Sequence, residues 1–353
     1  MQAKSLSKAV RPPEADAFPD YPASWYLFCE SGQLRDKPFS QRILGRQVVA
    51  YRKPSGQVAV MDAHCAHLGA DLGCGTVVGE TLQCPFHHWR YGADGVCQYV
   101  PNTTQAPPFA RLRTYPVEER HGQVFFFNGN EPLFPLPFFF GADASDFLAG
   151  KVFRYGADCA WYMTTANAFD MQHFSCVHGR DLIDQCQVDC PEPFARRNRY
   201  RAAIVGHSRC DGLLRSFAGH TVDVSITCWG GTFLLMTADF KRAHSCFLIA
   251  TRPLDDGTTL CEGIVFTRRS DNPLVRWLWQ PLSLFVRRWL TYAFVADESR
   301  NLRGIRYHPA GLTTDDVTMA DFFGWLVQLP AHQQGVRQEE VSLPERLAEA
   351  SNF

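Results

Sequence analysis

Residues 25–128 alternate short apolar runs with turn residues, a pattern that predicts a domain built from short β-strands. In 46–63 two apolar-alternating runs flank a Pro-Ser-Gly turn at 54–56, which is typical of a β-hairpin. Three further strand-like stretches are 75–85, 94–101 and 121–129. Because Cys84 ends one of these strands, we expect the loops of a small all-β domain to carry chemically active residues.

The pattern changes in the second half of the chain. Residues 160–178 favour a helix, and a sustained helical stretch runs from about Pro273 to Ile305. Between them lie five strand-like runs, 199–208, 221–229, 232–240, 245–254 and 260–269. Successive strands followed by one long helix predict an antiparallel sheet wrapped on that helix, an α+β layout with a deep cavity between the two.

These patterns divide the chain of 353 residues into three parts. We expect a mobile N-terminal arm at 1–22, the all-β domain at 23–130 and the α+β domain at 131–345. Residues 129–150 are rich in proline, glycine and phenylalanine, and we interpret them as a connector that packs across the second domain.

Composition narrows the partners and the compartment. The chain is 46% hydrophobic and 20% charged with a formal net charge of −1, and its arginines are scattered, so we expect no nucleic-acid partner. Thirteen cysteines without a regular framework, and an N-terminus without an apolar core like that of a secretory signal, predict a cytoplasmic location. No run approaches the ~20 apolar residues of a spanning helix.

The segment Trp277–Val286, together with Leu290–Val295, is the most apolar stretch of the late helix. It is broken by Gln280 and Pro281 and is followed by Arg287. Contact with a membrane interface is one interpretation, but we favour a helix that is buried or that contacts another subunit.

Two cysteine–histidine pairs are the strongest chemical signal. Cys65-x-His67 and Cys84-x-x-His87 are separated by sixteen residues, and each pair lies in a glycine-rich loop. A Rieske 2Fe–2S cluster needs two cysteines on one iron and two histidines on the other, which two such loops supply. Structural zinc is the alternative, although zinc fingers usually pair cysteine with cysteine and histidine with histidine along the chain.

A second candidate site lies in the first predicted helix of the α+β domain. Asp170 precedes His173 by three residues and so shares its helical face, and Asn167 lies three residues further back. His173 and His178 are five positions apart, so both rings reach one ion only if the helix ends or bulges near Ser175. Two histidines and a distant carboxylate form the facial triad of non-haem Fe(II), which leaves positions open for O2.

The missing carboxylate is expected on the late helix, facing the two histidines. The candidates are Asp297, Glu298 and Asp239. We choose Asp297 because it lies in the middle of the helix within an otherwise apolar and basic surround, followed by Glu298 and then by Asp239.

With both sites in hand, the chain resembles the oxygenase component of Rieske non-haem iron oxygenases. The family motifs C-x-H…C-x-x-H and N-x-x-D-x-x-H-x4-H are matched without a gap. Residues 23–52, 65–75 and 84–97 look most like the aminopyrrolnitrin oxygenase group of secondary-metabolite monooxygenases, and steroid-ring and Neverland-type sterol oxygenases have similar loops. The resemblance fades after about His178, so no substrate is carried over.

The resemblance implies a Rieske domain followed by a helix-grip, START-like catalytic domain, with a 2Fe–2S cluster and a mononuclear Fe(II) as cofactors. It also implies a homotrimer in which one subunit's cluster serves the neighbour's iron. There Asp170 matches the carboxylate that links the cluster ligand His87 to an iron ligand. Electrons would come from NAD(P)H through a flavin reductase, often with a ferredoxin, and the chain has no G-x-G-x-x-G motif of its own.

We therefore predict an oxidoreductase, a monooxygenase that hydroxylates a mostly apolar, ring-containing molecule of secondary metabolism. Asp170 and Asn167 are its predicted catalytic residues, and His173, His178 and Asp297 its predicted iron ligands. The same iron chemistry also gives N-oxygenation, demethylation, desaturation or oxidative cyclisation. A Rieske electron carrier and a zinc-stabilised binding module are the alternatives from other classes.

Overall fold

The computed structural model describes residues 12–35 and 37–331. Within them the chain forms two compact units. We call Leu27–Pro132 the β unit, and residues 12–26 together with Leu133–Ala331 the sheet–helix unit. No helix of the described residues has both the length and the apolar character needed to cross a membrane.

The β unit is built from short strands in three sheets. One sheet has the order β1-β11-β10, the second β2-β3-β4-β9 and the third β5-β6-β7-β8. The strands are β1 (Trp25–Glu30, in this unit from Leu27 on), β2 (Phe39–Ile43), β3 (Arg46–Arg52), β4 (Val58–Asp62), β5 (Thr76–Val78), β6 (Thr81–Gln83), β7 (Arg90–Tyr91), β8 (Cys97–Tyr99), β9 (Thr114–Tyr115), β10 (Val117–Arg120) and β11 (Gln123–Phe127). The hairpin predicted at 46–63 is β3 and β4, which pair antiparallel around Gly56, whose φ of +90° suits glycine.

The core of the β unit reaches into two of its loops. Its least exposed side chains include Val49, Met61 and Leu82, and Cys65 and Cys84 belong to the same apolar cluster. Because each cysteine closely follows a strand, β4 or β6, the sheets fix where the two thiols lie.

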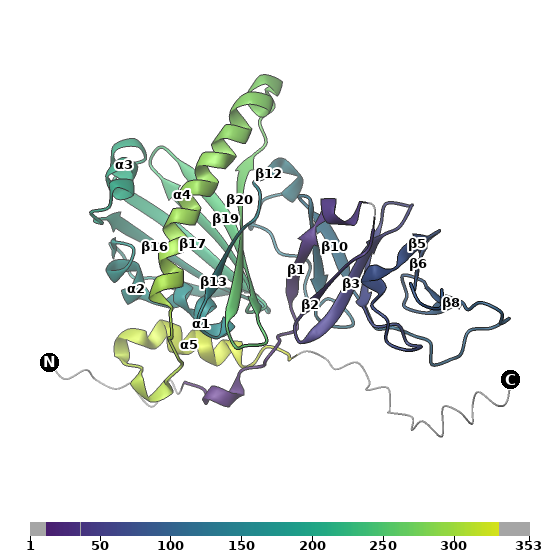
Figure 1. The fold of residues 1–353 in the computed structure, drawn as a ribbon. Coiled ribbons are helices and arrows are strands. Elements are labelled where there is room, and N and C mark those ends of the chain that lie inside the picture. The colour runs from purple at the N-terminus through teal and green to yellow at the C-terminus, as the bar shows by residue number, and fades with distance from the viewer. Residues whose placement is uncertain (1–11, 36, 332–353) are drawn as a thin grey trace. The chain divides into compact units, whose positions relative to one another are not determined.

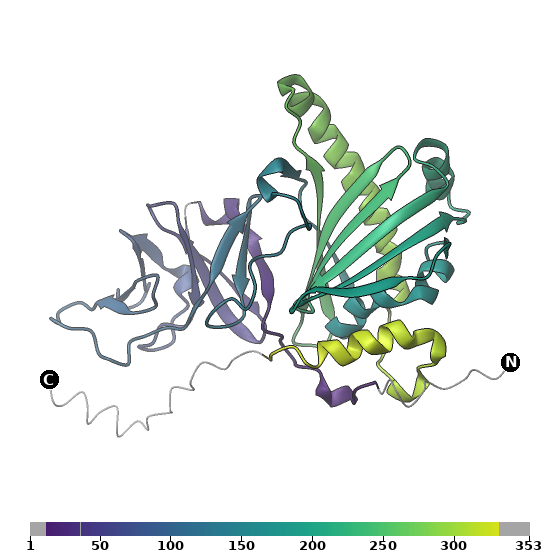
Figure 2. The ribbon, with the colours of Figure 1, turned by 180° about the vertical axis from the view of Figure 1, so that it is seen from behind.

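The sheet–helix unit contains, within the described chain, one antiparallel sheet of nine strands (Figures 1 and 2). Its main path is β12-β20-β19-β18-β17-β16-β14, with β13 also paired to β20 and β15 to β16. The strands are β12 (Phe147–Ala149), β13 (Phe153–Ala157), β14 (Arg180–Leu182), β15 (Gln187–Glu192), β16 (Ala195–Ile204), β17 (Thr221–Trp229), β18 (Phe233–Phe240), β19 (His244–Pro253) and β20 (Thr259–Arg268). The five predicted runs correspond to β16 through β20.

One long helix covers a face of this sheet. The helices are α1 (Trp161–Ala166), α2 (Met171–Cys176), α3 (Arg209–Phe217), α4 (Gln280–Asn301) and α5 (Val317–Leu326). In Figure 1 α4 crosses in front of the sheet, and in Figure 2 it lies behind it. A π-helical turn, Val275–Trp279, leads directly into α4, and Pro281 lies near the start of α4.

The other face of the sheet is covered in part by the predicted connector. Along β17, burial alternates at first and then becomes continuous from Ile226 to Trp229. Adjacent residues of a strand point to opposite faces, so both faces are covered at this end. Ile226 belongs to the core, whereas Trp229 contacts the rings of Phe134 and Phe140.

The described part of the expected mobile arm is packed. Phe18 is buried and its ring stacks on Tyr162 at a centroid distance of 3.9 Å, and Trp161 donates its indole N–H to the carbonyl of Pro19 at 3.1 Å. Residues 1–11 of the arm lie outside the described residues.

Phe169→Ala should destabilise the sheet–helix unit by about 3–5 kcal/mol, the usual cost of deleting a buried aromatic side chain. The Phe169 ring is fully buried and stacks on Phe322 at 4.0 Å. Phe217→Ala is the control, because that side chain is 70% exposed. Urea unfolding followed by tryptophan fluorescence measures both, and equal midpoints for the two variants would contradict this packing.

Candidate metal centres

The two cysteine–histidine loops of the β unit bury the cysteines and expose the histidines. Cys65 and Cys84 are 3% and 1% exposed, whereas His67 and His87 lie at the surface with ring centroids 4.6 Å apart. Two thiols on one side and two imidazoles on the other fit a 2Fe–2S cluster, in which one iron takes the cysteines and the other the histidines.

Contacts of the fold itself hold both loops in this arrangement. The N–H of Cys65 donates to the carbonyl of Ala70 at 3.0 Å, and the N–H of Cys84 donates to the carbonyl of Trp89 at 2.8 Å. Trp89 also stacks on His67 with a centroid distance of 4.6 Å and an interplanar angle of 3°. Contacts within the β unit thus contribute to the positions of both loops.

Tyr91 belongs to the cluster site although the sequence analysis did not identify it. Its hydroxyl oxygen accepts the N–H of Ala66 at 3.1 Å and lies 3.2 Å from Sγ of Cys65, so the hydroxyl hydrogen is available to the sulfur. Burial raises the pKa of Tyr91, which keeps that hydrogen on the oxygen. Motif spacing does not reveal this tyrosine, because the contact joins two different loops.

The second candidate centre begins at a break in the predicted helix. After α1 the chain makes a 3₁₀ turn at Asn167–Phe169, and α2 starts after Asp170. The Asp170 carboxylate caps α2 by accepting the N–H of His173 at 3.0 Å. Since α2 ends at Cys176, His178 lies beyond the helix and its ring lies 4.8 Å from that of His173. The helix therefore ends near the position that the two histidines require.

Three ligand-type atoms converge beside α2. The Nε2 atoms of His173 and His178 are 3.1 Å apart, and Oε1 of Glu298 lies 2.9 Å from the first and 2.5 Å from the second. Ligands about 2.1 Å from one ion are about 3 Å apart when the angle at the ion is near 90° and about 3.4 Å apart in a tetrahedron. The observed separations are short enough for the three side chains to bind one ion together.

Glu298 occupies the position that the sequence analysis gave to Asp297. Glu298 is 8% exposed and its carboxylate meets both histidines. The side chain of Asp297 lies outside the described part of the structure, and Asp239 pairs with His244 on the neighbouring strand. Among the candidate carboxylates whose side chains are described, only Glu298 reaches the histidines, and the choice of Asp297 stays a prediction on a side chain outside the described part.

The electrostatics of Glu298 favour a cation at this point. Burial alone would raise the pKa of Glu298, but the hydrogen bonds and the charge of His173 and His178 lower this pKa to about 2. The carboxylate is thus an anion that faces positive charge. A bound metal ion would supply positive charge in place of imidazolium charge, because histidine binds metals in its neutral form.

Asn167 and Arg180 form hydrogen bonds to the ligand-type residues. Nδ2 of Asn167 donates to Oε2 of Glu298 at 2.6 Å, which leaves Oε1 toward the histidines. Arg180 is buried, donates to the carbonyl of His178 at 2.6 Å and pairs with Asp211 at 2.8 Å. The sequence analysis did not identify Arg180, because its partner comes from α3, in a distant part of the chain.

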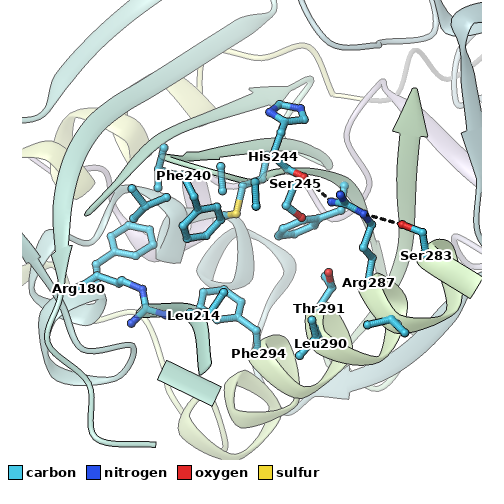
Figure 3. Close-up of a pocket in the computed structure, with 18 of the residues that line it drawn as sticks. Arg180, Leu214, Phe240, His244, Ser245, Ser283, Arg287, Leu290, Thr291 and Phe294 are labelled. Atoms are coloured by element: carbon cyan, nitrogen blue, oxygen red, sulfur yellow. Dashed lines mark hydrogen bonds between the residues drawn. The ribbon is translucent and has the colours of Figure 1, made fainter. Parts of the chain in front are cut away.

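A cavity of about 560 Å³ lies beside the three convergent side chains (Figure 3). Its walls come from the sheet and from α4 and are mostly apolar, as predicted for the space between them. Four of its wall residues also line the small space around the ligand-type residues, namely Phe174, Met236, Phe247 and Phe294. At one end Arg287 donates to the carbonyl of His244 and to the hydroxyl of Ser283, and Arg180 lines the cavity away from that end.

Comparison with known proteins gives matches for both units. Residues 24–116 match the family described as the Rieske [2Fe-2S] domain. The chain is 39% identical over 189 residues to the aminopyrrolnitrin oxygenase PrnD of Pseudomonas fluorescens, which covers 50% of this chain and 52% of that protein. It is 32% identical over 179 residues to the oxygenase component of 3-ketosteroid-9-alpha-monooxygenase of Mycolicibacterium smegmatis. That match covers 48% of this chain and 46% of that protein. The chain thus spans about half the length of the curated relatives it matches.

Solved structures share the fold over most of the chain. NdmA of Pseudomonas putida CBB5 with caffeine has a TM-score of 0.65 and 20% identity, over 86% of this chain and 89% of that one. Dicamba monooxygenase bound to dicamba has a TM-score of 0.59 and 20% identity, over 87% of this chain and 97% of that one. At this identity the likeness shows the fold alone.

The comparisons confirm three predictions made from the sequence. These are the resemblance to Rieske non-haem iron oxygenases, the α+β fold class with its β domain and antiparallel sheet, and the two cofactors, a Rieske 2Fe–2S cluster and a mononuclear iron.

Tyr91→Phe should lower the reduction potential of the cluster. A hydrogen bond of about 1.4 kcal/mol to the sulfur stabilises the extra electron of the reduced state by about 60 mV. A redox titration followed by EPR measures the potential. Tyr99→Phe, with an exposed ring on β8, is the control and should leave it unchanged. An unaltered potential in Tyr91→Phe would mean that the hydroxyl does not donate to the sulfur.

Glu298→Ala should release the mononuclear iron and keep the cluster, so that iron falls from about three to about two atoms per chain. Asp297→Ala, one position away, should retain about three. Iron analysis after reconstitution with Fe(II), combined with EPR of the reduced cluster, measures both variants. Loss of one iron from Asp297→Ala but none from Glu298→Ala would restore Asp297 as the ligand.

Proposed function

We propose that this chain is the oxygenase component of a Rieske-type monooxygenase, which uses O2 to hydroxylate a mostly apolar, ring-containing small molecule. The observation that carries this proposal is the group of His173, His178 and Glu298, with ligand atoms 2.5–3.1 Å apart beside a largely apolar cavity. A facial set of three protein ligands leaves the other side of the ion free for O2 near a substrate.

The two sets of ligands follow from the two loops and the two helices. In the β unit Cys65 and Cys84 hold one iron of the cluster, and His67 and His87 hold the other. In the sheet–helix unit His173, His178 and Glu298 hold the mononuclear iron, with Glu298 in place of Asp297. When bound, this iron supplies the activation of O2 with electrons delivered by the cluster.

The chain's own residues position the ligands and exclude water. Asn167 orients the carboxylate of Glu298, and Arg180 fixes the backbone of His178. Phe294 stacks on the His178 ring at 4.1 Å and lines the cavity. A dry wall next to the ligands protects the reacting centre from solvent.

The cavity favours an apolar ring system over a small anionic acid. Its volume of about 560 Å³ lies within the range of drug-sized ligand pockets. Relatives of this chain are named for aminopyrrolnitrin, for 3-ketosteroids and for cholesterol, all of which contain rings. One of these relatives is named a desaturase, so desaturation is the alternative outcome that a relative's name directly supports. N-oxygenation, demethylation and oxidative cyclisation start from the same chemistry.

Electrons come from a separate NAD(P)H-dependent flavin reductase, with or without a ferredoxin. The working assembly is a homotrimer in which His87 of one subunit meets Asp170 of the next. Asp170 suits this role because it is half-exposed and bonded directly to the backbone of His173. None of the twelve described cysteines forms a disulfide, in keeping with a reducing cytoplasm.

The test is turnover under ¹⁸O2 with NADH, a surrogate ferredoxin and reductase, and a panel of arylamine and steroid substrates, followed by mass spectrometry. We expect ¹⁸O in the product of the wild type. His173→Ala should give no product although its cluster is still reduced. A reducible cluster whose reoxidation by O2 depends on none of these substrates, in wild type and mutant alike, would favour the electron carrier.

Asp170→Asn separates electron transfer from folding, because asparagine caps a helix as well as aspartate does. The variant should keep its iron and its cluster and lose about 10- to 100-fold in turnover, as expected for a residue that supports a metal ligand. Full turnover in Asp170→Asn would remove this carboxylate from the path between the two centres.

A further inference from the structure

The outer side of α4 and of the π-helical turn before it is strongly apolar. We call the following side chains, each 41–76% exposed, the α4 apolar face: Leu274, Trp277, Leu278, Trp279, Leu282, Phe285, Val286, Trp289 and Tyr292. Most of them recur every three or four residues, the spacing of one side of a helix. In a soluble protein such a stripe normally faces the core, so this one needs a different partner.

Positive charge predominates around the α4 apolar face, with exposed Asp271 as an acidic residue just before it. Residues 272–296 contain Arg276, Arg287 and Arg288 and no acidic residue. Exposed Arg268 and Arg269 follow at the end of β20, close in sequence to the π-helical turn. The face is therefore apolar and aromatic with a cationic border.

The same face is continuous with the cavity beside the ligand-type residues. Trp279, Leu282 and Val286 are exposed at the surface and also line the cavity. Deeper in the cavity the wall continues along α4 through Leu290 and Phe294 (Figure 3). An apolar path thus leads from the outer surface of the helix to the candidate iron site.

We propose that the α4 apolar face docks on the surface of an anionic lipid bilayer. Trp277, Trp279 and Trp289 would lie among the headgroups, where tryptophan is enriched. The exposed Arg268, Arg269 and Arg276 would lie near lipid phosphates. An apolar face rich in Trp, Phe and Leu together with arginine is the pattern of interfacial helices. The role of this docking in substrate entry rests on the proposed function, because an apolar substrate dissolved in lipid would reach the cavity without crossing water.

A second copy of the chain fits the face less well. Symmetric dimers place the same patch on both sides of the contact, so α4 would meet α4. Arg276, Arg287 and Arg288 of the two copies would then approach one another without an acidic residue of 272–296 between them. Like charges at short range oppose such a contact, whereas a bilayer surface supplies phosphates.

The test measures binding of the full-length holoprotein to vesicles, with no turnover required. Vesicles of phosphatidylcholine alone are compared with vesicles containing about one-quarter phosphatidylglycerol. We expect cosedimentation with the anionic vesicles, weakened by salt, and quenching of tryptophan fluorescence by brominated lipid. The variant Trp277→Ala/Phe285→Ala/Trp289→Ala should bind the anionic vesicles at least about tenfold more weakly than the wild type.

The control variant is Leu213→Ala/Phe217→Ala, which removes equally exposed apolar side chains from α3 and should bind like the wild type. Iron analysis that returns about three atoms per chain, one of them in the sheet–helix unit, confirms that every variant is folded. The proposal is overturned if wild type ignores both kinds of vesicle, or if the triple variant binds as well as wild type. It is also overturned if light scattering shows that the triple substitution dissociates an oligomer while vesicle binding is unchanged, since a second copy then covers the face.

Discussion

The sheet–helix unit depends on one contact, the approach of Glu298 to two imidazoles beside α2. Oε1 of Glu298 lies within 2.9 Å of both Nε2 atoms, and the three side chains are at most 10% exposed. Buried charge at this spacing persists only where a cation or bound protons balance it. The scaffold must hold α4 and α2 together, which explains why Asn167 and Arg180 each fix one ligand-type residue from outside the triad.

The same helix couples the ligand-type residues to the space for substrate. Phe294 precedes Glu298 by four residues, so the two share one face of α4. The Phe294 ring stacks on the His178 ring with an interplanar angle of 21° and also lines the cavity. A molecule in the cavity that displaces Phe294 would therefore affect both Glu298 on α4 and His178 beside α2.

The sequence predicts what is encoded over short distances. The Cys–His pairs and the Asn167–His178 motif lie within single loops or turns, so spacing alone identifies their chemistry, and alternation identifies β16 to β20. Spacing does not identify the third ligand-type residue, because Glu298 and His178 are 120 positions apart in the sequence. Adjacent residues of a helix point about 100° apart, and α4 is apolar on its outer as well as its inner side. Its pattern therefore could not decide whether Asp297 or Glu298 faces the sheet.

The exposure of the two centres constrains how electrons pass between them. In the β unit the imidazoles lie at the surface and the cysteines inside, so His67 and His87 would connect a bound cluster to the surface. In the sheet–helix unit the triad is buried, but half-exposed Asp170 is one hydrogen bond from His173. Each centre thus has a surface contact of its own, and the two need not belong to one chain. This is the arrangement that a homotrimer would exploit, because His87 of one subunit could meet Asp170 of the next whenever the two surfaces dock.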